Sequence, residues 1–434
     1  MNEPSNTPPS APSPAAAAPA APAASAASPE AGGMRAFHTF LWARGLSVLA
    51  ANMQVVAVGW QVYAMTGDPF DLGLVGLCQF LPSILLVLVV GHVADRYDRR
   101  VIVRVCVAVE ALCMLALTHG SVPASLVPGG GWLTPPLIFA IVVAIGAVRA
   151  FSQPTNQAIV ANLVPRAELP RGMALNMMVN RTAAILGPAA GGFLYVAGPA
   201  VAYAIGAALY IVATVLLGLV RMPRIERVAE PVSLRSVFAG LAFIRSRPAM
   251  FGAISLDLFA VLLGGATALL PAYAQDVLQT GPWGLGLLRA APALGSLPAA
   301  LWLARHPLGG KVGRTMLIAV ACFGIATIVF GLSTSFTVSF CALLVLGASD
   351  AVSVVIRSTM VQLQTPDDMR GRVSAVNSVF IGSSNELGEF ESGVLAALFG
   401  TVPAVVMGGV GTLLVVALWT RLFPELARYD RLNH

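Results

Sequence analysis

The chain is dominated by apolar stretches long enough to cross a lipid bilayer. Examples are LIFAIVVAIGAV, at 137–148, and GTLLVVALW, at 411–419, and similar stretches recur along the 434 residues. A spanning helix needs about 20 predominantly apolar residues. Because 57% of the residues are hydrophobic and only 11% are charged, a water-soluble fold could not bury this surface. The sequence therefore predicts an integral membrane protein.

Apolar periodicity predicts twelve membrane-spanning helices. They are expected at about 36–65, 70–93, 101–120, 136–161, 173–197, 200–221, 249–275, 283–305, 315–334, 336–363, 373–398 and 402–423. We divide the chain into a disordered Ala/Pro-rich tail at 1–34, six-helix bundles at 35–221 and 249–423, a linker at 222–248 and a C-terminal tail at 424–434. The linker contains an amphipathic helix that either lies on the inner leaflet or packs on the protein.

Arginine and lysine fall in alternate loops. Arg96, Arg166, Arg245 and Lys311 are examples, whereas the intervening loops contain neither residue type. Cytoplasmic loops collect these residues, so we expect both termini to be cytoplasmic. The net charge of +6 is therefore a feature of membrane topology, and no nucleic-acid partner is expected.

An internal repeat relates the two halves. An offset of 201 positions aligns several identical residues in two helices and their loop, among them Gly146 with Gly347, Gly187 with Gly388 and Gly192 with Gly393. Two repeated bundles around a central site suit alternating access, so the repeat favours a transporter over a receptor or an enzyme. No G-x-x-x-x-G-K-[ST] loop is present, which makes ATP hydrolysis by this chain improbable.

The stretch GHVADRYDRR lies at the expected turn between the second and third helices. It resembles the signature loop of the major facilitator superfamily through Gly91, Asp95, Arg96, Arg99 and Arg100, and its DRYDRR form is similar to that of the bacterial enterobactin-exporter-like group. The resemblance implies an all-α major facilitator fold and a loop that latches the two halves in the outward-open state. A simple positive-inside anchor is the alternative.

The fifth helix contains GPAAGG, formed by Gly187, Pro188, Gly191 and Gly192. It resembles the antiporter signature of facilitator-superfamily exporters, in which close packing could prevent proton leakage. A proline kink with tight packing and no role in coupling is the alternative.

Ionisable residues within the membrane are costly and are candidates for function. For proton coupling we select Glu389, Glu386, Asp257 and Asp350, and for cavity charge or cargo binding Arg149, Arg44, Arg181, Arg289 and Glu391. Arg149 and Asp350 are equivalent in the repeat and could pair across the cavity, either as a switch or as a permanent ion pair. Glu110 is an exception, because the resemblance places its helix toward lipid. Arg357 is interpreted as a side chain that reaches the membrane surface.

These observations predict a monomeric secondary transporter of the bacterial inner membrane, without a cofactor or bound metal, that exports a small amphiphilic compound in exchange for protons. The resemblance to the enterobactin-exporter-like group implies that the cargo is a siderophore or drug. An importer is one alternative, disfavoured by GPAAGG. A non-transporting membrane sensor or partner-binding protein is the other, and for such a protein the cavity charges would be superfluous.

Overall fold

The computed structural model describes residues 29–86, 89–90, 93, 96–164, 168–220, 234–306 and 310–430, which form helices and connecting loops without a strand. The first half contains α1 (Pro29–Thr66), α2 (Pro69–Leu85), α4 (Arg99–Ser121), α5 (Pro135–Leu163), α6 (Leu169–Val196) and α7 (Pro199–Leu219). The second contains α8 (Leu234–Arg245), α9 (Pro248–Leu263), η2 (Ala266–Leu269), α10 (Leu270–Ala272), η3 (Tyr273–Val277), α11 (Pro282–Arg305), α12 (Val312–Leu332), α13 (Phe336–Gln364), α14 (Asp367–Phe399), α15 (Thr401–Leu422) and α16 (Pro424–Ala427).

The chain is an all-helical, multi-pass membrane protein. Within the described ranges, nine helical segments are long and apolar enough to cross a membrane. Helix α2 is apolar but has only 17 residues, whereas α6 and α14 are long helices with more polar faces. With these three, the described chain has the twelve crossing segments that the sequence predicts.

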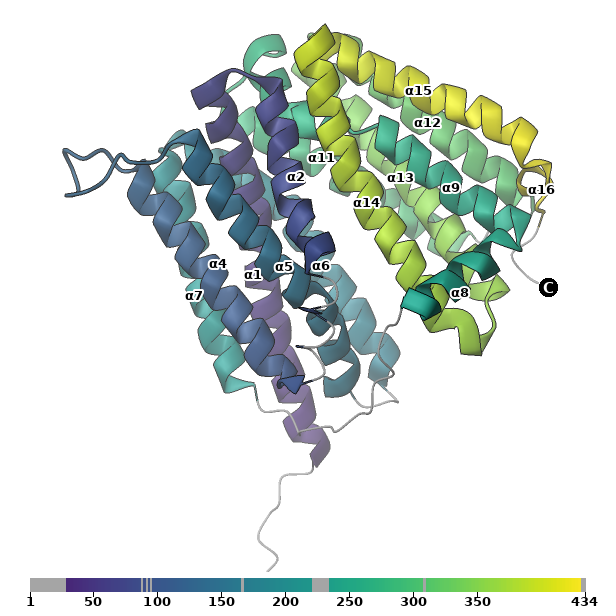
Figure 1. The fold of residues 1–434 in the computed structure, drawn as a ribbon, viewed down its shortest axis with the longest axis horizontal. Helices are drawn as coiled ribbons and strands as arrows, with labels where there is room; N and C mark the ends of the chain where they lie inside the picture. The colour runs from purple at the N-terminus through teal and green to yellow at the C-terminus, as the bar shows by residue number, and fades with distance from the viewer. Residues whose placement is uncertain are drawn as a thin grey trace, which may run out of the picture.

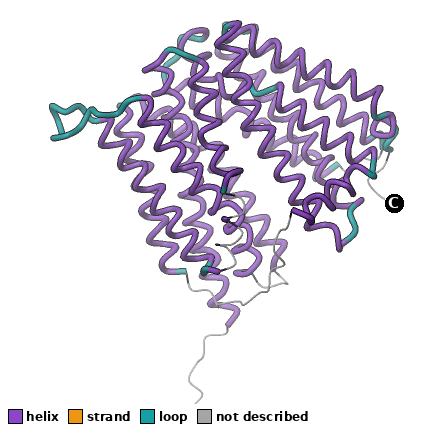
Figure 2. The backbone as a smooth tube through the Cα atoms, in the orientation of Figure 1, coloured by secondary structure: helices purple, strands orange, loops and turns teal. Residues whose placement is uncertain are grey.

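The helices form two groups (Figure 1). In the first, α1 packs on α6 and α7, and α4 packs on α5 and α7. In the second, α13 packs on α11 and α12, and α9 packs on α14 and α15. The two groups lie close together at the upper end of the view in Figures 1 and 2, and their lower ends diverge.

Glycine contacts hold the two groups together at this closed end. A Cβ added at Gly393 of α14 would lie 2.6 Å from the Cα of Gly73 in α2, and one added at Gly192 of α6 would lie 2.9 Å from the Cα of Gly286 in α11. Small residues allow such close approach of membrane helices. The residues that the repeat aligns, Gly192 and Gly393, thus make equivalent contacts between the groups.

Hydrogen bonds reinforce the closed end. The Tyr63 hydroxyl of α1 donates to the Asp276 carboxylate in η3, and the side-chain amide of Gln275 donates to the Trp60 carbonyl oxygen at 3.5 Å. Polar groups in the membrane need such partners because water is scarce there.

The seventh crossing segment is interrupted, although a continuous helix was predicted at 249–275. Helix α9 ends at Leu263, a 3₁₀ turn follows, and Tyr273–Val277 forms a π-helix. Gly264 and Gly265 follow the end of α9, and Pro271 lacks a backbone N–H, which weakens the α-helical hydrogen bonds here. The backbone of Gly265 also lies against that of Gly388, where a Cβ would clash. Broken helices of this kind commonly border the binding site of secondary transporters.

Helix α8 packs on the protein at the open end, against α9 and α14. Ile244 is fully buried among Met250, Ile254 and Val373, whereas Phe238 is exposed. Of the two positions that the sequence left open for the amphipathic helix, the structure therefore shows packing on the protein.

Candidate functional site

A charged cluster lies between the two helix groups. It lines a cavity of about 140 Å³ with Gln79 from α2, Arg149 from α5, Arg289 from α11, and Glu386 and Glu389 from α14. An Arg289 Nη2 atom lies 3.9 Å from Oε1 of Glu389, and Arg149 Nη1 donates to Gln79 Oε1 at 2.7 Å. Four of the residues selected from the sequence thus meet where both groups contribute, which is where a transporter exposes a site alternately to each side.

The position of Glu389 depends on a glycine across the interface. A Cβ added at Gly76 of α2 would lie 3.0 Å from Oε2 and 3.1 Å from Cβ of Glu389. The carboxylate therefore packs directly on the α2 backbone. Glu386 precedes Glu389 by one helical turn and so lines the same cavity. Movement of α2 relative to α14 would change the surroundings of both carboxylates.

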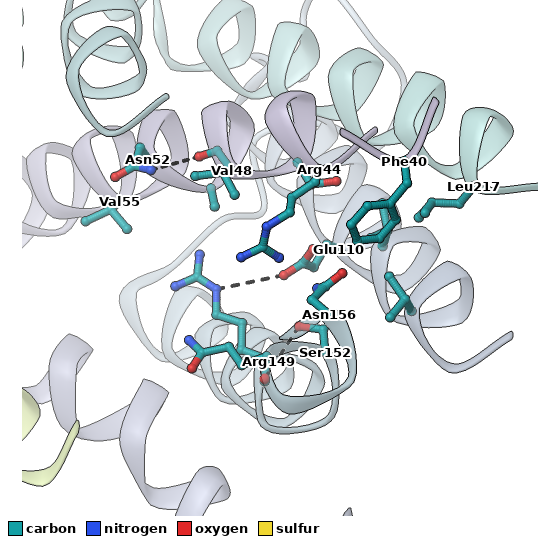
Figure 3. A pocket seen from close by; sticks show the side chains of 15 residues that line it. Phe40, Arg44, Val48, Asn52, Val55, Glu110, Arg149, Ser152, Asn156 and Leu217 are labelled. Carbon is teal, nitrogen blue, oxygen red and sulfur yellow. Dashed lines mark hydrogen bonds and ion pairs between the residues drawn. The ribbon is translucent and has the colours of Figure 1, made fainter. Parts of the chain in front are cut away.

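A second, larger cavity of about 410 Å³ lies within the first helix group (Figure 3). Arg44 from α1, Glu110 from α4 and Arg149 from α5 point toward one another, and Arg149 Nε lies 3.8 Å from Glu110 Oε1. Glu110 is only 6% exposed. It therefore faces the interior of the helix group and not lipid, and it is a functional candidate that the sequence interpretation set aside.

The predicted pair between Arg149 and Asp350 is not formed. Arg149 pairs with Glu110, whereas Asp350 lines a small pocket with Asp257, Ser349 and Ser353 in the second helix group. The two charges are equivalent in the repeat, but Arg149 has its partner within the first helix group, on the neighbouring helix α4, and Asp350 lies in a separate pocket of the second group.

Asp257 belongs to a buried network in the second group. Arg357 Nη2 lies 3.1 Å from Asp257 Oδ2, and Arg357 Nη1 donates to Asn377 Oδ1 at 3.2 Å. Arg357 is 3% exposed, so the expectation that it reaches the membrane surface is wrong. The paired carboxylate stabilises this arginine at a depth where an isolated charge would be costly.

The GPAAGG segment packs α6 closely on two neighbours. Added Cβ atoms would lie 2.5 Å from Asn52 Cβ at Gly187 and 2.8 Å from Met53 Cα at Gly191, both in α1, while Gly192 contacts α11. Pro188 lies inside a helix that continues from Leu169 to Val196. The segment therefore provides tight packing next to the closed end. Such packing is expected both for an antiporter signature and for a proline kink without a role in coupling.

The structure describes the signature loop continuously from Arg96 onward. Asp98, within the DRYDRR stretch, caps α4: its Oδ1 accepts a hydrogen bond from the Arg100 backbone N–H at 2.9 Å, and Arg100 Nη2 lies 2.7 Å from Asp98 Oδ2. A side-chain acceptor at this position satisfies a free helix N–H. Gly91 and Asp95 lie outside the described residues, so the latch stays a prediction, as does the part of Arg96 and Arg99 in it.

Two further residues selected from the sequence lie apart from these cavities. Arg181 is exposed on α6. Glu391 is on α14, and its Oε2 atom is buried without a hydrogen-bond partner in the described structure. Across the described residues, no group of three or more His, Cys, Asp or Glu side chains is placed to hold a metal ion.

The helices and these charged cavities define a membrane protein with two repeated bundles and a polar site between them. A family model described as Major Facilitator Superfamily matches residues 40–388. The chain belongs to this family of transporters and is not an enzyme.

Curated relatives and solved structures agree with this assignment. The protein named enterobactin exporter EntS of Shigella boydii serotype 18 (strain CDC 3083-94 / BS512) is 27% identical over 396 residues, covering 91% of this chain and 93% of that protein. EntS of Escherichia coli O157:H7 (strain EC4115 / EHEC) is 26% identical with the same coverage.

Two similar solved structures are inward-facing. A bacterial homolog of the human lysosomal transporter Spinster, in an inward-facing and unoccupied conformation, has a TM-score of 0.70 and 14% identity, covering 93% of this chain and 99% of that chain. A bacterial homologue of the iron transporter ferroportin has a TM-score of 0.69 and 15% identity, covering 91% and 99%. At these identities the likeness shows the fold alone.

Proposed function

We propose that this transporter is a monomeric, proton-coupled exporter of the bacterial inner membrane that carries a small amphiphilic compound, such as a siderophore or drug, by alternating access. The observation that supports this proposal most strongly is the cavity between the helix groups, in which Glu386 and Glu389 lie beside Arg149 and Arg289. A carboxylate there can bind a proton from one side and release it on the other, if the cavity opens alternately.

The distribution of arginine supports an orientation with both termini in the cytoplasm. In that orientation the divergent ends of the helix groups face the cytoplasm, and the glycine contacts close the outer end. The structure then corresponds to the inward-facing state, from which an exporter accepts its cargo.

Two observations support export over import. The GPAAGG segment packs α6 tightly on α1 and α11, which limits a proton pathway along this side of the cavity. The curated relatives described above are named exporters. Because they are only 26–27% identical to this chain, their cargo indicates a chemical class rather than a particular compound.

The coupling role of Glu389 follows from its pairing. Its ionised carboxylate interacts with Arg289 across 3.9 Å. Protonation removes the negative charge and leaves Arg289 without this partner, which changes the charge of the cavity by one unit. Binding of a proton thereby changes the charge that the cargo meets between the helix groups, which links the two as antiport requires.

Inverted membrane vesicles that contain the protein test this proposal. A proton gradient is established, and its dissipation is followed as siderophores, lipophilic cations and antibiotics are added. We expect a cargo to dissipate the gradient with the wild type and with Glu425→Gln, a control at an exposed carboxylate of α16, but not with Glu389→Gln. Passage of a labelled cargo without proton movement in the wild type would contradict proton coupling.

A further inference from the structure

The cavity inside the first helix group has an excess of positive charge. Arg44 and Arg149 face it from α1 and α5, whereas Glu110 is the only carboxylate among the described residues that line it. The Arg149 Nε atom is 3.8 Å from Glu110 Oε1, too far for a close charge-assisted hydrogen bond. The cavity thus has two cations and one loosely paired anion.

Both arginines retain unused hydrogen-bond donors. Arg44 Nε and Arg149 Nη2 are buried, and neither has a hydrogen-bond partner in the described structure. Figure 3 shows the side chains of Arg44, Arg149 and Glu110 converging on the same space. A cationic side chain within the membrane is costly when its donors lack partners, and an anionic ligand in this cavity would supply partners to both arginines.

The remaining lining indicates the rest of the ligand. Phe40, Val48, Val55 and Leu217 provide apolar walls, and Asn52 is among the neutral polar groups beside the arginines. A volume of about 410 Å³ suits a small organic molecule. The combination matches an amphiphile with an acidic group, since guanidinium groups bind carboxylates well.

We propose that this cavity binds the acidic group of a small organic anion between Arg44 and Arg149, and that Glu110 is the resident anion with which the ligand competes. The identification of this ligand with the cargo rests on the proposed function. Arg149 also lines the cavity between the helix groups, so an anion bound here would affect the residue that neighbours Glu386.

Glu110 is expected to weaken the binding of an anion in this cavity. Its ionised carboxylate offsets one of the two positive charges and repels a second anion. Glu110→Gln keeps the size of the side chain and removes the negative charge, which should strengthen anion binding. A purely structural ion pair predicts the opposite or no effect on the ligand.

Binding of salicylate and of its neutral analogue salicylamide to the purified full-length protein tests the proposal. We expect salicylate to bind at least about tenfold more tightly than salicylamide, Arg44→Gln to remove this preference, and Glu110→Gln to raise salicylate affinity by about tenfold. Arg104→Gln, at an exposed arginine of the same helix as Glu110 and outside the cavity, should behave like the wild type.

Equal affinities for the two probes in the wild type, or an undiminished preference in Arg44→Gln, would overturn the proposal. Both tests use only the wild type and Arg44→Gln, so they remain decisive even if Glu110→Gln does not fold. Failure of the proposed function gives a different pattern: salicylate would still bind at the arginines, but no compound would move protons in the vesicle assay.

Discussion

The contact between Gly73 and Gly393 offers a direct way to change the balance of conformations. In the described structure an ideal Cβ at Gly393 would lie 2.6 Å from Gly73 Cα, 2.8 Å from Gly73 N and 3.1 Å from the Pro69 carbonyl oxygen. Ordinary van der Waals contacts of a Cβ are 3.4–4 Å. In Gly393→Ala, α2 and α14 must therefore separate by roughly 1 Å or lose the contact.

The expected size of the effect follows from overpacking. Forcing one methyl group into a close-packed backbone contact costs about 1–3 kcal/mol. This cost falls only on the conformation in which the two glycines touch. The equilibrium should therefore shift by a factor of about 5 to 150 toward the conformation in which this end opens, which is outward-facing in the proposed orientation.

Distances between spin labels can measure this shift. Labels at Met65 of α1 and Phe399 of α14, both exposed side chains near the closed end, report the separation of the helix groups there. We expect Gly393→Ala to increase the population at the longer distance. The matched control is Gly382→Ala in the same helix, because an added Cβ there would meet nothing within 4 Å.

An unchanged distance distribution in Gly393→Ala would refute the reasoning, provided that the variant folds. An equal shift in Gly382→Ala would also refute it, because the higher helix propensity of alanine would then explain the result without the glycine contact.

Two further predictions concern other polar contacts. Tyr63→Phe removes the hydrogen bond to Asp276 at the closed end and should favour outer opening by about 1.5–3 kcal/mol. The measurement is the labelling rate of a cysteine placed in the outer half of the cavity, which should rise; an unchanged rate would contradict the prediction. Asp257→Ala leaves Arg357, whose side chain is 4% exposed, without its carboxylate partner and should destabilise the protein by about 3–5 kcal/mol. The measurement is the melting temperature, which should fall, whereas a control substitution at the exposed Asp430 should have little effect on it.

The fold could be predicted from the sequence because the signals for membrane helices are local. Apolar length predicted the crossing segments, including α6 and α14, whose polar residues reduce their mean hydropathy. The repeat offset also predicted that Gly192 and Gly393 occupy equivalent positions, and both contact the opposite helix group.

The charge pairs could not be predicted in the same way, because they depend on the rotation and packing of each helix. Glu110 illustrates the difference: its assignment to a lipid-facing helix came from the family resemblance, whereas the cost of a charge in lipid was the stronger signal and required an interior position. The break after Leu263 had a local signal, Gly264, Gly265 and Pro271, that apolar length alone did not take into account, whereas the approach of Gly265 to Gly388 is seen only in the structure.

Transport in reconstituted vesicles tests the central claim most directly. The compound identified by proton movement is supplied as a labelled tracer at equal concentrations on both sides, a pH gradient is imposed, and the membrane potential is held at zero. We predict that the tracer accumulates on the side from which protons flow, and that Glu389→Gln abolishes the accumulation. Equilibration of the tracer without accumulation in the wild type would contradict proton-driven antiport.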